Sequence, residues 1–226
     1  MRRSLAILGT LLLMGCAEGA AVTRGAPVGT GIEGERVSFL AALRGAGATP
    51  ASAQEALPTL RWDHRPEGER WTEATLVALR SHGAALPATV PDGIEAWCPA
   101  YAEAPQEDRE AFWAGLISAL SKHESTYRPE AVGGGGKWFG LVQIAPATAR
   151  GYGCAAGSGD ALKDGAANVA CAVRIMATKA RGGADGVRSI ASDWGPFHSA
   201  SKREEMRAWV SQQPFCASGA SGAGGA

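Results

Sequence analysis

The chain has 226 residues, of which 46% are hydrophobic and 19% are charged, a composition typical of a globular protein rather than a disordered one. Lysine and arginine together number 22, as do aspartate and glutamate, so the chain lacks the excess of basic residues that nucleic-acid binding requires. The length predicts one domain with an appended linker.

The first sixteen residues have the pattern of an export signal. Arg2 and Arg3 precede a mostly apolar stretch over residues 4–14, which is shorter than the roughly 20 apolar residues that span a bilayer. The stretch ends in the sequence LMGC, which resembles the bacterial lipobox and finishes at Cys16. In that motif the cysteine is acylated and becomes the mature N-terminus. An ordinary secretory signal with a chance cysteine is the alternative.

The lipobox interpretation predicts a signal peptide over residues 1–15 and a lipid anchor at Cys16, in the cell envelope and facing the periplasm. Ala17 follows the cysteine where aspartate would indicate inner-membrane retention, so the outer membrane is favoured. Residues 16–56 are rich in alanine and glycine and are predicted to form a flexible tether. Residues 217–226 have nothing to bury and are predicted to be a disordered tail.

Residues 57–97 are predicted to form an N-terminal helical extension that packs on the domain that follows. Within it, Thr72 has the character of an N-cap before a helix that ends near Ser81. The chain shows no apolar–polar alternation of any length, which is the pattern of half-buried strands. We therefore expect a mainly α fold.

Four cysteines remain after Cys16: Cys98, Cys154, Cys171 and Cys216. Four cysteines allow three pairings, and disulfides are favoured in an oxidising envelope compartment. The nested pairing, Cys98 with Cys216 and Cys154 with Cys171, is our prediction. A zinc site is the alternative, but no two of these cysteines have the short spacing that zinc sites favour. No metal site and no cofactor are predicted.

A helix is predicted over residues 107–123, with a carboxylate at its end. One helical face carries, at spacings of four, three and four, Trp113, Ile117, Leu120 and Glu124. Partial burial of a carboxyl group disfavours its ionised form and raises its pKa. A glutamate that stays protonated near neutral pH is suited to act as a general acid. The alternative is that Glu124 only marks the end of the helix.

Short motifs follow this helix in a fixed order. The pair ES, at Glu124 and Ser125, precedes GLVQI over residues 140–144, PATA over 146–149 and GYG over 151–153. This order resembles the soluble-lytic-transglycosylase-like (SLT) domain of the lysozyme superfamily. That family carries a helix-terminal ES, then GLMQI, then a short helix that starts with proline.

The resemblance covers about residues 108–200 and implies a lysozyme-like domain over residues 98–216, with at most a small β element. Such enzymes cleave the β-1,4 bond between N-acetylmuramic acid and N-acetylglucosamine in peptidoglycan, using one glutamate. The glutamate protonates the leaving oxygen and then takes the proton of the sugar's 6-hydroxyl, which closes a 1,6-anhydro ring. Glu124 matches this glutamate. The implied partners are peptidoglycan glycan strands and, through the anchor, a membrane, but no nucleic acid.

The same resemblance implies several substrate-binding residues. Ser125 matches the serine beside the acid, with a helix-end cap as its alternative role. Gln143 matches the glutamine of the cleft, with a plain loop hydrogen bond as its alternative. Val142 stands where many members have methionine and would form an apolar wall beside a sugar. Trp138 and Trp194 are predicted to stack on sugar faces, with core packing as the alternative for each.

The last family motif is where this sequence departs. The family typically has AYNxGP, in which the tyrosine lies near the reacting acetamide, whereas residues 191–196 read ASDWGP and contain no tyrosine. Asp193 falls at or beside that place and would supply a charge or hydrogen bond instead. A second carboxylate that orients water would make the protein a hydrolytic muramidase. A non-catalytic peptidoglycan-binding lipoprotein is the third possibility.

Three further positions complete the predictions. Residues 164–176 resemble the family's next helix, which Asn168 is predicted to cap. His123 lies about 100° round the helix from Glu124 and is predicted to be a packing or surface residue. The glycine run at residues 133–136 lacks the ending of a phosphate loop and is predicted to be a flexible turn at the edge of the cleft.

Overall fold

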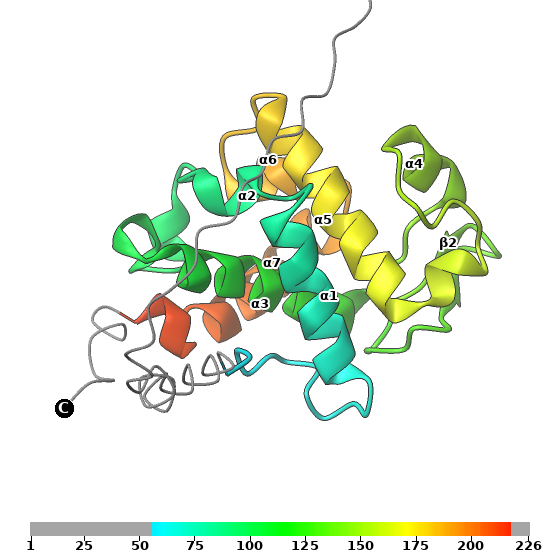
Figure 1. Cartoon of the computed structure of the whole chain (residues 1–226), viewed down its shortest axis with the longest axis horizontal. Helices are drawn as coiled ribbons and strands as arrows, with labels where there is room; N and C mark the ends of the chain where they lie inside the picture. The colour runs from blue at the N-terminus through cyan, green and yellow to red at the C-terminus, as the bar shows by residue number, and fades with distance from the viewer. Residues whose placement is uncertain (1–55, 218–226) are drawn as a thin grey trace, which may run out of the picture. The chain divides into compact units, whose positions relative to one another are not determined.

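The computed structural model of the chain describes residues 56–217 (Figure 1). Predictions that fall on residues 1–55 and 218–226 lie outside the described residues, among them the signal peptide, the lipid anchor at Cys16 and nearly all of the tether and tail. Within the described part, no helix combines the length and the apolar character needed to cross a membrane.

The described part is mainly helical, and its two short strands form one hairpin. This confirms the predicted fold class. Its α-helices are α1 (Gly68–Arg80), α2 (Ala85–Ala88), α3 (Gln106–Glu124), α4 (Pro146–Gly151), α5 (Gly165–Arg181), α6 (Val187–Ile190) and α7 (Ala200–Val210). The strands are β1 (Val132–Gly133) and β2 (Trp138–Phe139). Short 3₁₀ turns lie at Ile94–Ala96, Tyr101–Glu103, Ala161–Lys163, Gly195–Phe197 and Pro214–Cys216.

Helix α3 is the centre of the domain. Every residue from Glu110 to Ser121 is buried, so the helix is enclosed on all its faces rather than on one stripe. Helices α1, α2 and α7 pack around it, and α1 also lies beside α5 (Figure 1). The predicted helix is confirmed, and Glu124 is its last residue, shortly after the buried part.

Two predicted caps are wrong, and for the same physical reason. Thr72 lies inside α1, where its hydroxyl donates to the carbonyl of Gly68 (3.1 Å) and accepts from the indole of Trp62 (2.9 Å). Asn168 lies inside α5, whose N-cap is Asp164, a carboxylate that accepts from the backbone N–H of Ala167 (2.9 Å). In both cases a tertiary partner engages the polar side chain within the helix.

The hairpin is closed by glycines. Strands β1 and β2 pair antiparallel, with Val132 opposite Phe139 and Gly133 opposite Trp138. The three glycines of the turn, residues 134–136, all have positive φ, a conformation that other residues rarely adopt. The indole of Trp138 lies so close over Gly134 that a Cβ there would come within 2.1 Å of it. The glycine run thus lets the Trp138 ring lie against the turn.

Both predicted disulfides are confirmed. Cys98–Cys216 joins the segment before α3 to the end of the described chain, across a sequence separation of 118 residues. Cys154–Cys171 joins the segment after α4 to α5. In the loop-entropy picture each bridge stabilises the fold by roughly 3–5 kcal/mol. The second bridge holds the α4 region, which forms one wall of the site described next, against the body of the domain.

Candidate active site

The C-terminal end of α3 faces a groove with a volume of about 550 Å³. The end of α3, the β1–β2 hairpin, the loop around Gln143, and the stretch from Asp193 into α7 meet there. The lining consists of His123, Glu124, Gly133, Gly134, Trp138, Gln143, Asp193, Trp194, Gly195, Pro196 and Lys202. The structure therefore brings Glu124 together with four of the residues predicted to bind substrate.

The carboxyl group of Glu124 is set up to carry a proton at neutral pH. Burial raises its pKa from an ordinary value of 4.5 to about 7, and the positive charge of Lys202 opposes that rise only in part. A carboxyl with a pKa near the working pH is able both to donate a proton and to take one back. Glu124 thus meets the electrostatic requirement of a general acid that later acts as a base.

Gln143 faces the groove from a constrained loop. Its φ is +51°, which is uncommon for a residue other than glycine. Its side-chain amide donates to the carbonyls of Gly140 (2.9 Å) and Ala131 (3.2 Å). Its Oε1 packs closely against Gly133, where an added Cβ would lie only 2.2 Å from this oxygen. The loop hydrogen bonds left open as an alternative are therefore present, and the amide lies fixed against the hairpin.

Asn168 holds this loop from behind, a role that the sequence pattern did not reveal. Its Oδ1 accepts from the N–H of Val142 (2.9 Å), and its Nδ2 donates to the carbonyls of Phe139 and Leu162 (3.0 Å each). At Gly140, where φ is +85°, a Cβ would come within 2.1 Å of the Leu162 carbonyl. Asn168 therefore links α5 to the segment that carries Gln143.

Ser125 and Val142 lie behind the groove rather than on its surface. The Val142 side chain is fully buried, and its carbonyl accepts from the indole of Trp194 (2.8 Å). Ser125 is 3% exposed; its hydroxyl donates to the Ser121 carbonyl (3.3 Å) and accepts from the N–H of Arg128 (3.1 Å). These contacts correspond to the helix-end cap that was the alternative reading of Ser125.

The two tryptophans differ in how much ring they present. Trp138 is 46% exposed on the hairpin, at the rim of the groove. Trp194 is 4% exposed and is tied through its indole N–H to the core. Trp138 thus has a face available for stacking, whereas Trp194 contributes mainly to packing beneath the groove.

A second hollow of about 480 Å³ extends the groove beyond Glu124. It shares Trp138, Gln143, Asp193 and Trp194 with the first and adds residues of α4 and the segment after it. One of these is Tyr152. The site therefore extends over two adjoining hollows, and Asp193 lies at their junction.

Asp193 is held by two partners at this junction. Its Oδ1 lies 2.9 Å from Nζ of Lys179, and its Oδ2 accepts from the hydroxyl of Tyr152 (3.3 Å). Burial, followed by the charge of Asp193, raises the pKa of Tyr152, so the phenol keeps its proton. A phenolic hydroxyl thus does lie beside the groove, supplied by the segment after α4. The only sequence signal for it was the GYG motif.

Comparison with known proteins bears on this groove. Residues 102–192 match the family model described as the transglycosylase SLT domain. By this match, residues 102–192 form an SLT domain. The match contains Glu124, Gln143 and Tyr152 and ends directly before Asp193. It supports an activity of the lytic-transglycosylase type, directed at peptidoglycan.

Solved structures share the fold of this SLT domain. Three of them are structures of Bd0314 DslA, one of the wild type and two of glutamate-to-glutamine mutants. Each is 21% identical to this chain, covers 72% of it and is itself covered completely, with TM-scores of 0.62 to 0.63. No curated protein sequence matches the chain.

The described part of the SLT-domain protein has no group of three or more histidine, cysteine, aspartate or glutamate side chains placed to hold a metal ion. The groove combines one carboxyl of raised pKa, one ion-paired carboxylate, an amide and an exposed indole ring. Such a set suits acid–base chemistry on a neutral polar polymer with ring faces to stack on, such as a glycan.

Proposed function

We propose that the groove cleaves the β-1,4 bond between N-acetylmuramic acid and N-acetylglucosamine in peptidoglycan, leaving 1,6-anhydro-muramic acid ends, with Glu124 as the single acid and base. The observation that carries the proposal is the Glu124 carboxyl, with a pKa raised by burial to about 7, at the wall of a groove in an SLT domain.

The proposed reaction returns Glu124 to its starting state. The protonated carboxyl donates its proton to the glycosidic oxygen as the bond from that oxygen to C1 of muramic acid breaks. The substrate's own acetamide stabilises the positive charge at C1. The Glu124 carboxylate then removes the proton of the 6-hydroxyl while O6 bonds to C1, which closes the ring without consuming water.

The other groove residues would orient the glycan. We propose that Trp138 stacks on a sugar ring and that Gln143 contacts an acetamide or hydroxyl group. The Tyr152 hydroxyl and Asp193 would hold polar groups of the sugar at the junction of the two hollows. Together they take over the position for which the usual motif supplies a tyrosine.

A hydrolytic muramidase is the second candidate, because Asp193 lines the same groove as Glu124. The contacts of Asp193 support the transglycosylase instead. Lys179 and Tyr152 each contact one oxygen of the Asp193 carboxylate and hold it in place at the junction of the two hollows, which suits a residue that binds the sugar.

Product analysis tests the proposal. Purified sacculi are digested with the mature protein, and the released muropeptides are separated and weighed. Transglycosylation predicts muropeptides with anhydro ends, each lighter by one water than its hydrolysed counterpart. Reducing ends alone would establish the muramidase, and binding to sacculi without release would establish a non-catalytic lipoprotein.

We also propose that the protein acts at a membrane of the cell envelope, outer membrane favoured, anchored through Cys16 and facing the periplasm. The proposal rests on the LMGC sequence and on the alanine- and glycine-rich stretch after it. An anchor with a long tether would keep the groove beside the cell wall while letting it reach many glycan strands.

A further inference from the structure

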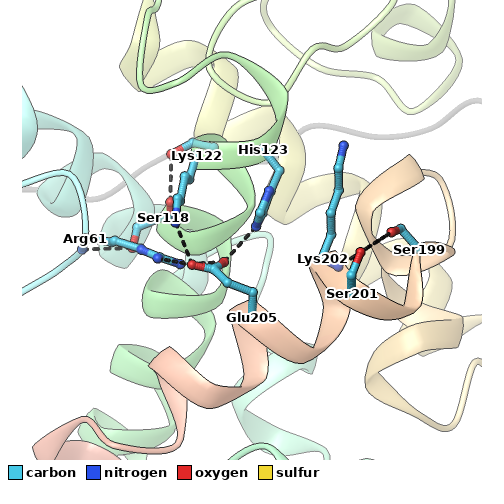
Figure 2. Close-up of polar contacts among 9 residues, drawn as sticks. Arg61, Ser118, Lys122, His123, Ser199, Ser201, Lys202 and Glu205 are labelled. Carbon is cyan, nitrogen blue, oxygen red and sulfur yellow. Dashed lines mark hydrogen bonds and ion pairs between the residues drawn. The ribbon is translucent and has the colours of Figure 1, made fainter.

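Glu205 of α7 faces the last turn of α3 and gathers three cations or potential cations there (Figure 2). Its Oε1 accepts from Nζ of Lys122 (2.6 Å), and its Oε2 lies 2.7 Å from Nε2 of His123. Arg61, from the segment before α1, donates to both oxygens through its two terminal nitrogens. One carboxylate thus links three separate parts of the chain.

The cluster formed by Arg61, Lys122, His123 and Glu205 lies next to residues that line the groove. Lys122 and His123 directly precede Glu124 in the final turn of α3. Lys202, three residues before Glu205 on α7, lines the groove, and its charge acts on Glu124. Residues three apart lie on the same face of a helix. The contacts of Glu205 therefore fix the spacing between the helix that carries the acid and the helix that carries the cation acting on it.

We propose that Glu205 is a positioning residue for Glu124: its carboxylate clamps the last turn of α3 to α7 and offsets the positive charge gathered behind the acid. Glu205 does not line the groove, so it would act on the reaction only through Glu124. The proposal rests on the function proposed above for Glu124.

The charges around the two glutamates set the direction of the expected effect. The groups that face Glu205 are Arg61, Lys122, His123 and, in the turn after α3, Tyr127. Lys202 and Asp193 line the groove together with Glu124, and of these two it is the charge of Lys202 that acts on Glu124. Without the Glu205 carboxylate, the positive charges of Arg61 and Lys122 would be unbalanced behind Glu124 and would favour its ionised form.

The Glu205 carboxylate is charged at every pH at which a cell wall enzyme works. Hydrogen bonds from Arg61 hold the pKa of Glu205 far below its usual range, and Lys122 and His123 add to that effect. The clamp therefore does not open within the working pH range, and only a substitution would remove it.

Helix α7 itself supplies a matched control. Glu204 is the neighbour of Glu205, but it pairs with Arg207 one turn along the same helix, and its side chain is 61% exposed. Glu204→Gln removes the same charge from the same helix as Glu205→Gln. Only Glu205→Gln also removes contacts to α3.

The test compares the full mature protein with its Glu205→Gln and Glu204→Gln variants. In the pH profile of kcat/KM for sacculus digestion, the alkaline limb should move to lower pH in Glu205→Gln, by on the order of half a pH unit. That shift is about a twofold loss of rate at pH 7, with little loss at pH 5. Glu204→Gln should match the wild type. An unchanged limb in Glu205→Gln, or an equal shift in Glu204→Gln, would overturn the proposal.

Lys122→Met provides a second variant with an effect of opposite sign. It removes one of the positive charges gathered at Glu205 and leaves Glu205 bound to Arg61 and His123, so the limb should move to higher pH. A shift to lower pH would contradict the proposed charge balance. If Glu205→Gln does not fold, Lys122→Met still tests whether the charges gathered at Glu205 act on Glu124.

A readout that needs no activity separates this proposal from the proposed function. The side-chain carboxyl carbon of Glu124 is followed by NMR as a function of pH in the wild type and each variant. The same shifts in the pKa of Glu124 are expected. If the wild type cuts no sacculi, the proposed function fails, and the NMR titration still decides whether Glu205 controls Glu124.

Discussion

Replacement of Glu124 by glutamine should make the protein more stable, and only above about pH 5. Glutamine is close in shape to a protonated glutamate and never ionises. In the wild type, Glu124 must ionise in a buried site as the pH rises, because burial raises its pKa to about 7. The folded wild type therefore loses stability with rising pH in a window where the variant does not.

The size of the effect follows from linkage. The pKa of Glu124 in the folded state is about 7, against an ordinary value of 4.5. Between these two values the folded state binds more protons than the unfolded state, so the free energy of unfolding falls as pH rises. At about 1.4 kcal/mol per pKa unit, the wild type loses about 3 kcal/mol by pH 8. For a domain of this size that is about 6 to 12 °C in melting temperature.

The assay is urea or thermal unfolding of both proteins from pH 4 to pH 8. Groups common to the two proteins cancel in the difference between their free energies of unfolding. That difference should be near zero at pH 4 and should rise through pH 5 to 7 in favour of Glu124→Gln. A difference that stays constant across the range would refute the raised pKa, and with it the reason for assigning Glu124 as the acid.

Four further predictions test other parts of the account. Asn168→Ala should destabilise the fold by about 2–4 kcal/mol in urea unfolding, because three backbone groups lose a buried partner, and should lower activity by loosening the Gln143 loop. Replacement of Cys154 and Cys171 by serine should lower the free energy of unfolding by about 3 kcal/mol. Tyr152→Phe should weaken sacculus digestion about tenfold while leaving the melting temperature within about 2 °C, since its hydroxyl is at the groove surface. Cys16→Ser should move the protein from the membrane fraction to the soluble periplasmic fraction, and an unchanged distribution would refute the anchor.

The features foreseen from the sequence are those that depend on local pattern or on chain chemistry. Helix α3 was predicted because apolar side chains recur at helical spacing up to Glu124. The nested disulfides, Cys98–Cys216 and Cys154–Cys171, were predicted because the N-terminal pattern indicates export to an oxidising compartment and because no two of these cysteines have metal-site spacing. The motifs after α3 indicated the SLT domain.

The features not foreseen depend on contacts between distant segments. Tyr152 meets Asp193 across 41 positions of the sequence, and no local pattern signals such a pair. Asn168 and Thr72 have the residue types of helix caps, yet tertiary partners place both inside helices. Ser125 matches its family motif, but the tight turn after α3 directs its hydroxyl to the backbone behind the groove.

In the proposed function, Glu124 drives cleavage of peptidoglycan glycan strands in the groove. The most direct test is the release of soluble muropeptides from purified sacculi at pH 6 by the wild type and by Glu124→Gln, with the melting temperature of each measured in the same buffer. The wild type should release anhydro muropeptides and the variant none, although the variant should melt no lower than the wild type. Undiminished release by a folded Glu124→Gln protein would contradict this role of Glu124.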